Sequence, residues 1–82
     1  MPTLLPTASL LDVGAFITAC LAEGARIRAA AHAQRIARSM AGDIPGCSAV
    51  LREMHRALAR LDAHRDATVA AWGEMATALA TH

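Results

Sequence analysis

The sequence predicts an all-α protein in which two long antiparallel helices form a hairpin. Twenty-one of its 82 residues are alanine, which has the highest helix propensity, and the chain contains no tyrosine or lysine. Glycine and proline cluster at residues 42–46, which read Gly-Asp-Ile-Pro-Gly. We therefore expect a turn at 42–47, a first helix over about 9–41 and a second over about 48–80, all within one domain.

Local signals place the ends of both helices. Ser9 followed three residues later by Asp12 fits a capping box at the start of the first helix. Gly42 supplies the left-handed residue that commonly ends a helix. Pro45 prevents simple continuation, so we expect the second helix to open at Cys47 or Ser48, of which the serine is the better cap.

The second helix has the clearer hydrophobic pattern. Its seam advances in alternating steps of three and four residues, the spacing of an antiparallel or coiled-coil contact. The nine seam positions, all apolar except Arg65 and Thr68, are Leu51, Met54, Leu58, Leu61, Arg65, Thr68, Trp72, Met75 and Leu79. A turn centred near residues 44 and 45 sets Ile17 opposite Trp72. It also brings Glu23 to Arg65 and Thr68, which predicts a polar layer with a Glu23–Arg65 ion pair.

The first helix is apolar on every side between Val13 and Ala22, where the sequence has no charged residue. One partner helix cannot cover such a surface, so it predicts association with a second hairpin into a homodimeric four-helix bundle. A short alanine-rich hairpin also buries too little surface to be very stable alone. The predicted protein interface comprises Val13, Phe16, Ile17, Cys20, Leu21, Trp72 and Met75. Our leading interpretation is a non-enzymatic protein-binding module: a small regulator, adaptor or chaperone-like protein.

Charge is distributed unevenly despite a net charge of +1. All eight arginines lie between residues 26 and 65, at the turn half of the hairpin. The charged residues of the remaining segments are all Asp or Glu. An alternative function is therefore nucleic-acid binding through a basic surface. That surface would comprise Arg28, Arg35, Arg38, Arg52, Arg56 and Arg60. Arginines on an ordinary solvated helix face are the competing interpretation, since several follow an acidic residue by three positions.

No catalytic or cofactor signature emerges from the sequence. The four histidines, at positions 32, 55, 64 and 82, lack the spacings that helical metal sites use. There is no arrangement of nucleophile and base, and no glycine-rich phosphate loop after a strand. We expect no enzyme, no cofactor and no bound metal. A small-molecule or metal site in the polar layer of Glu23, Arg65 and Thr68 remains a third alternative.

The two cysteines and the apolar segments bear on location. In a hairpin, Cys20 and Cys47 lie roughly 30–40 Å apart at 1.5 Å per helical residue, so an intrachain disulfide is not expected. The apolar run at 13–22 is too short to cross a bilayer and lacks the basic flank of a signal peptide. These features predict a cytoplasmic protein without a membrane partner.

Overall fold

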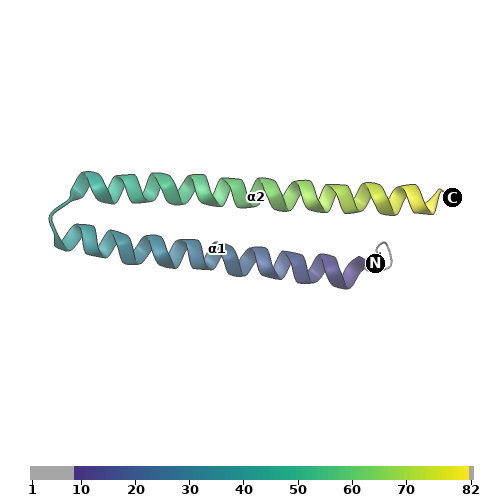
Figure 1. Ribbon diagram of the computed structural model, residues 1–82, viewed down its shortest axis with the longest axis horizontal. Helices are drawn as coiled ribbons and strands as arrows, with labels where there is room; N and C mark the ends of the chain where they lie inside the picture. The colour runs from purple at the N-terminus through teal and green to yellow at the C-terminus, as the bar shows by residue number, and fades with distance from the viewer. Residues whose placement is uncertain (1–8, 82) are drawn as a thin grey trace, which may run out of the picture.

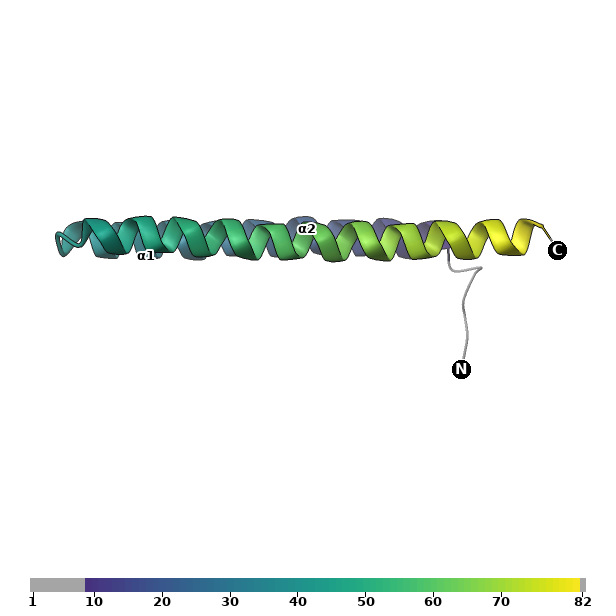
Figure 2. The same ribbon diagram turned by 90° about the horizontal axis from the view of Figure 1, so that it is seen from above.

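The hairpin is confirmed by the computed structural model, which describes residues 9–81, with side chains from Asp12 onward. Helix α1 spans Ser9–Met40 and helix α2 spans Ile44–Ala80. The two helices run antiparallel and side by side over the length of α1 (Figures 1 and 2). Within the described range there is no strand, and the molecule is a rod of 62 × 18 × 16 Å.

The end of α1 is a Schellman motif. Gly42 has a φ of +74°, the left-handed conformation that the sequence predicted for it. The N–H of Gly42 donates to the carbonyl of Ser39 at 3.0 Å, and the N–H of Asp43 donates to the carbonyl of Arg38 at 2.8 Å. These two bonds satisfy carbonyls that the end of a helix would otherwise leave unpaired. The helix ends at Met40, one residue before the expected position.

Helix α2 begins at Ile44, so the predicted start at Ser48 was too late. The N-cap is Asp43, whose Oδ1 accepts a hydrogen bond from the N–H of Gly46 at 2.9 Å. Pro45 lies in the first turn, where a helix leaves its N–H groups unpaired, so proline begins this helix instead of preventing it. The predicted cap at Ser9 lies outside the described side chains.

The shorter turn changes how the helices face each other. A Cβ built on Gly24 would lie 3.7 Å from Cδ2 of Leu61, so Gly24 faces Leu61, which lies four residues before the predicted neighbour Arg65. Nearer the turn, Sγ of Cys47 donates to the carbonyl of Arg35 at 3.6 Å. Relative to the predicted register, the α2 residues that face this part of α1 lie about one helical turn closer to the turn.

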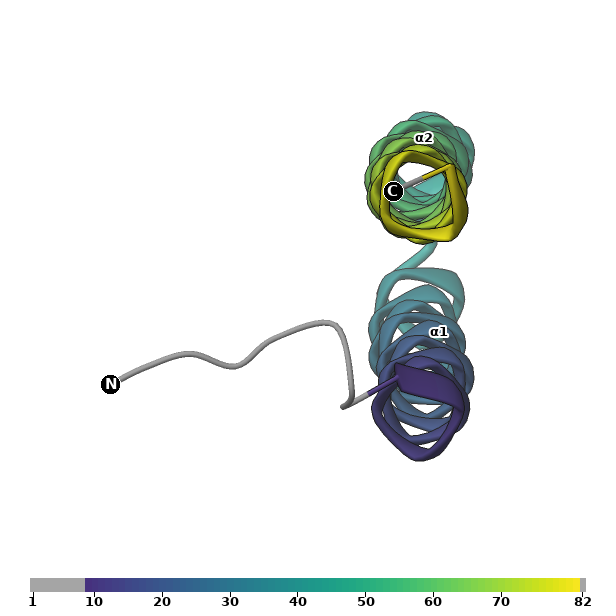
Figure 3. The same cartoon turned by 90° about the vertical axis from the view of Figure 1, so that its right-hand side faces the viewer.

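The hairpin is a single layer with a thin core. Viewed end-on, α1 and α2 lie one beside the other and no further element covers either broad face (Figure 3). The buried apolar residues in the described range are Cys20, Ala31 and Val50, and none of the side chains described is less than 2% exposed. The radius of gyration is 18.3 Å, whereas a compact domain of this length has about 12 Å. Burial therefore comes from a narrow seam alone.

Candidate functional site

Part of the predicted interface is used inside the hairpin. The ring of Phe16 lies edge-on to Trp72, with ring centroids 5.5 Å apart and an interplanar angle of 88°. The same ring meets His64 at 5.6 Å and 71°. Cys20 is only 7% exposed at the seam, and Val13 is half-buried. These side chains hold α1 against α2, so they are not available as a free association surface.

The other predicted interface residues remain exposed. The exposed fraction is 63% for Leu21, 36% for Ile17 and 42% for Met75. Val69 on α2, which the sequence analysis did not include, is 37% exposed. It immediately follows the seam residue Thr68, and its position beside the seam was the signal that could have identified it.

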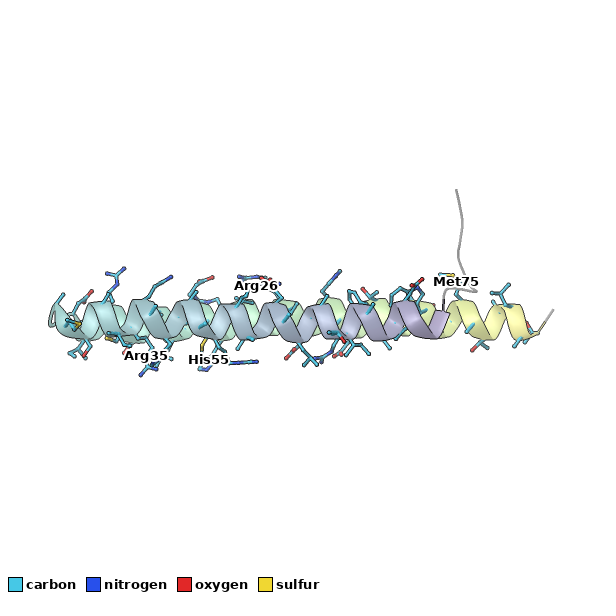
Figure 4. All side chains as sticks on the ribbon, turned by 90° about the horizontal axis from the view of Figure 1, so that it is seen from below. Arg26, Arg35, His55 and Met75 are labelled. Atoms are coloured by element: carbon cyan, nitrogen blue, oxygen red, sulfur yellow. The ribbon has the colours of Figure 1, made fainter. Side chains whose placement is uncertain are left out.

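Side-chain directions separate the two broad faces of the rod. Arg35 and His55 project from one broad face, here called the Arg35 face, whereas Arg26 and Met75 project from the opposite one (Figure 4). Residues seven or fourteen positions apart lie on the same side of a helix in such a pair. Leu21 precedes Arg35 by fourteen residues.

The same spacing indicates on which broad face the exposed apolar residues lie. Val69 follows His55 by fourteen residues, and Ile17 precedes Leu21 by four. All three therefore lie on the Arg35 face, in the half of the rod away from the turn. We refer to Ile17, Leu21 and Val69 as the apolar patch. Met75 lies on the other face and does not belong to this patch.

The predicted Glu23–Arg65 ion pair is not formed. Oε1 of Glu23 accepts from Nε and Nη2 of Arg26 at 2.9 and 2.7 Å, within α1. Arg65 donates to Asp66 at 3.0 Å and to Asp62 at 3.2 Å, within α2. The hydrogen bond to Asp66 is the main reason that the pKa of Arg65 is raised. Each charge is thus satisfied by a residue on its own helix.

Without this pair, Glu23 is not part of the predicted polar layer. Thr68 is half-buried at the seam, whereas Glu23 is exposed. Among the described residues, no three His, Cys, Asp or Glu side chains gather closely enough to hold a metal ion. His64 contacts Phe16 and does not stand on a purely polar face. Cys20 and Cys47 are both free thiols.

Three of the six arginines assigned to a basic surface pair with carboxylates. Arg38 pairs with Asp43 at 3.1 Å across the turn. Arg56 and Arg60 both donate to Glu53, at 3.0 and 3.3 Å. A hydrogen bond from Arg60 and a weaker one from Arg56 lower the pKa of Glu53 below its ordinary value of 4.5. Asp43 and Glu53 therefore offset two of the three positive charges in this half of the predicted surface.

The Glu53 cluster predicts a specific acid sensitivity. A carboxylate whose pKa is lowered by folding adds stability above its unfolded pKa and loses that contribution as the pH falls. We expect the melting temperature to decline below about pH 4.5, with a smaller decline in Glu53→Gln. Thermal melts of both proteins from neutral pH to about pH 3 measure this difference. The matched control is Glu74→Gln, because the residues three and four positions from Glu74 are all Ala or Thr. Its melting temperature should decline with pH as much as that of the wild type.

The remaining three arginines form no ion pair with any residue that the structure describes: they are Arg28, Arg35 and Arg52. Arg28 lies seven residues before Arg35, and Arg52 lies three before His55, so all of them belong to the Arg35 face. His32 and Arg35 line a shallow hollow beside Cys47. We call Arg28, His32, Arg35, Arg52 and His55 the basic strip.

The Arg35 face therefore carries two different surfaces. The basic strip occupies its turn half and the apolar patch occupies the half near the chain ends. Neither described helix contains a stretch that is both apolar enough and long enough to span a membrane. Comparison of the chain with protein-family models, with curated proteins and with solved structures finds no match.

Proposed function

We propose that this protein is a non-enzymatic interaction module whose hairpins associate through the apolar patch into a four-helix bundle. The main observation in support is the exposure of large apolar side chains in a rod that has almost no core. In the described range, eight such residues are at least 36% exposed: Ile17, Leu21, Ile36, Met40, Ile44, Val69, Met75 and Leu79. Covering apolar surface is the dominant favourable contribution to association.

The dimensions of the rod suit a second copy as the partner. A stable protein interface buries about 800 Å² on each partner. The rod is 62 Å long and at least 16 Å wide, so a whole broad face exceeds this area, whereas the half near the chain ends offers the smaller contact typical of a transient interface. A second hairpin would also present the same patch, as a two-fold symmetric contact requires.

Charge selects the orientation of the two hairpins. Parallel hairpins joined by their Arg35 faces would place Arg28 and Arg35 of the two copies against each other, which like-charge repulsion disfavours. Antiparallel hairpins that overlap only near the chain ends bring the two apolar patches together. In that arrangement the basic strips lie at opposite ends of the dimer, away from the contact.

Leu21→Asp tests this proposal. We expect light scattering to give about twice 8.6 kDa for the wild type and a monomer mass for the variant, because a carboxylate would enter the apolar contact. The matched control is Ala29→Asp, since Ala29 is exposed and lies on the opposite side of α1 from the buried Ala31. A monomeric wild type, or equal masses for the two variants, would refute the proposed interface.

Leu21 is a better test position than Phe16. Because Phe16 packs on Trp72 within one hairpin, a charge at Phe16 would unfold the helices whether or not a dimer exists. Leu21 is 63% exposed, so Leu21→Asp should keep the far-UV circular dichroism of the wild type at low temperature. Retained helicity together with a lower mass is the result that identifies an association surface.

The apolar patch is also where we propose that a target protein binds, in the way that an amphipathic helix lies on a groove. A target on this patch would compete with the second hairpin. Bait protein carrying Leu21→Asp should then retain no target from a lysate of the native organism, whereas Ala29→Asp bait should retain what the wild type retains. A target held equally by all three baits would place its binding elsewhere.

A further inference from the structure

We propose that the basic strip binds the phosphate backbone of double-stranded nucleic acid, independently of base sequence. This activity is separate from the association through the apolar patch, because the two surfaces occupy different halves of the Arg35 face. The inference depends on which arginines are paired, on where the unpaired ones lie, and on what surrounds them.

The arginines fall into two groups, those that pair with a carboxylate and those whose positive charge is available to a ligand. Arg38, Arg56 and Arg60 already donate to two carboxylates, which offset two of their three charges. Arg28, Arg35 and Arg52 form no ion pair within residues 12–81. An unpaired guanidinium presents its planar donors to solvent and matches two phosphate oxygens at once. These three side chains therefore carry the accessible positive charge.

Their placement concentrates that charge on one side. Arg28, His32 and Arg35 follow each other by four and three residues, so they lie on one side of α1. The hydrogen bond from Sγ of Cys47 to the carbonyl of Arg35 fixes the start of α2 beside them. From Arg28 to Arg35 the strip extends about 10 Å, the length of about three base-pair steps at 3.4 Å each.

The surroundings favour a polyanion over other partners. Residues 24–42 contain no Asp or Glu, so α1 has no carboxylate that could repel a phosphate along the strip. On α2, the nearest carboxylate is that of Glu53, which is engaged by Arg56 and Arg60. Regularly spaced phosphates on a rigid duplex complement a rigid helix pair with fixed positive charges.

The strip contains no Phe, Tyr or Trp on which a base could stack. Both aromatic residues of the chain, Phe16 and Trp72, pack on each other in the other half of the rod. Stacking on bases is therefore absent from this surface, and the strip's donors are suited to phosphate oxygens. We expect similar affinity for duplexes of different sequence and a strong dependence on salt.

The test compares two triple variants that lose the same charge. One replaces the strip arginines: Arg28→Gln, Arg35→Gln and Arg52→Gln. The other replaces paired arginines and leaves Arg60 on Glu53: Arg26→Gln, Arg38→Gln and Arg56→Gln. Binding to a mixed-sequence DNA duplex is followed by fluorescence anisotropy at several salt concentrations. Three phosphate contacts give a slope of about −2.7 in log affinity against log salt.

We expect the strip variant to lose at least about tenfold in affinity and most of the salt slope, because its phosphate contacts are gone. The control variant should stay within about threefold of the wild type. Equal losses in both variants would show a response to net charge alone and would overturn the assignment of the strip. No binding by the wild type at low salt would also overturn it, as would tighter binding to poly-glutamate or to anionic vesicles than to DNA.

Two further measurements keep this result separate from the association proposal. Circular dichroism should show unchanged helicity in both triple variants, since they replace exposed side chains. Light scattering should show the strip variant with the mass of the wild type. A strip variant that changes oligomeric state would mean that these arginines lie at the contact between hairpins, contrary to the proposal.

Discussion

Replacing Phe16 with alanine is expected to lower the free energy of unfolding by about 3 kcal/mol, the low end of the range for Phe→Ala at packed positions. Phe16 is the α1 side chain that meets both Trp72 and His64, each edge-on at 5.5–5.6 Å. Such aromatic pairs add stability beyond the area that they bury. The low end applies because Phe16 is half-buried.

Urea denaturation followed by far-UV circular dichroism measures this loss. The control is Ile36→Ala, which removes an apolar side chain that is 47% exposed and should cost less than about 1 kcal/mol. Both variants are compared with the wild type at one protein concentration, so that any association contributes equally. Equal losses at the two positions would mean that the aromatic cluster does not hold the helices together.

The size of this expected effect follows from composition. Alanine makes helices easily but buries little surface, so an alanine-rich hairpin concentrates its packing energy in a few large side chains. The buried seam residues Cys20, Ala31 and Val50 are all small. Phe16 and Trp72 are the only Phe and Trp of the chain, and they meet across the seam.

Much of the fold could be predicted from sequence because its determinants are local or periodic. The three-and-four spacing along α2 identifies the side that packs, and it correctly includes Leu61, which lies against Gly24. The left-handed Gly42 was identified because few other residues adopt that conformation. Both signals depend on neighbouring residues alone and require no knowledge of the partner helix.

The start of α2 was not predicted because two signals were given the wrong weight. Pro45 was taken as an interruption, although proline is tolerated in the first turn of a helix. Asp43 was treated as a turn residue, although aspartate is as good a cap as serine. The error of four residues then carried into the register, because the turn sets which residues meet.

The predicted Glu23–Arg65 ion pair was wrong for a related reason. Helical neighbours three residues apart are always within reach, whereas a cross-helix pair also requires the correct register. Glu23 therefore binds Arg26, and Arg65 binds Asp62 and Asp66, instead of each other. The sequence does not distinguish the unpaired Arg28 and Arg35 from the arginines that pair with carboxylates. Ion pairs can be identified only once the side chains are placed.

Gly46→Ala is expected to cost about 2 kcal/mol, even though alanine usually stabilises a helix relative to glycine. A Cβ at Gly46 would overlap the carboxylate of Asp43 and lie 2.9 Å from Cδ of Arg38. The carboxylate would have to move away from the N–H of Gly46, which loses the cap of α2 and the Arg38 pair together. Loss of such a cap costs about 1 kcal/mol and relieving the overlap about 2 kcal/mol, of which the higher helix propensity of alanine returns up to about 1 kcal/mol.

A double-mutant cycle separates this mechanism from a general intolerance of the turn. Asp43→Ala alone removes the cap and should cost about 1 kcal/mol. In that background the carboxylate is absent, so adding Gly46→Ala should no longer cost stability and should restore up to about 1 kcal/mol through helix propensity. Urea denaturation of the wild type, both single variants and the double variant gives the coupling. Additive losses would show that Gly46 is required for its backbone and not for the space that the Asp43 cap occupies.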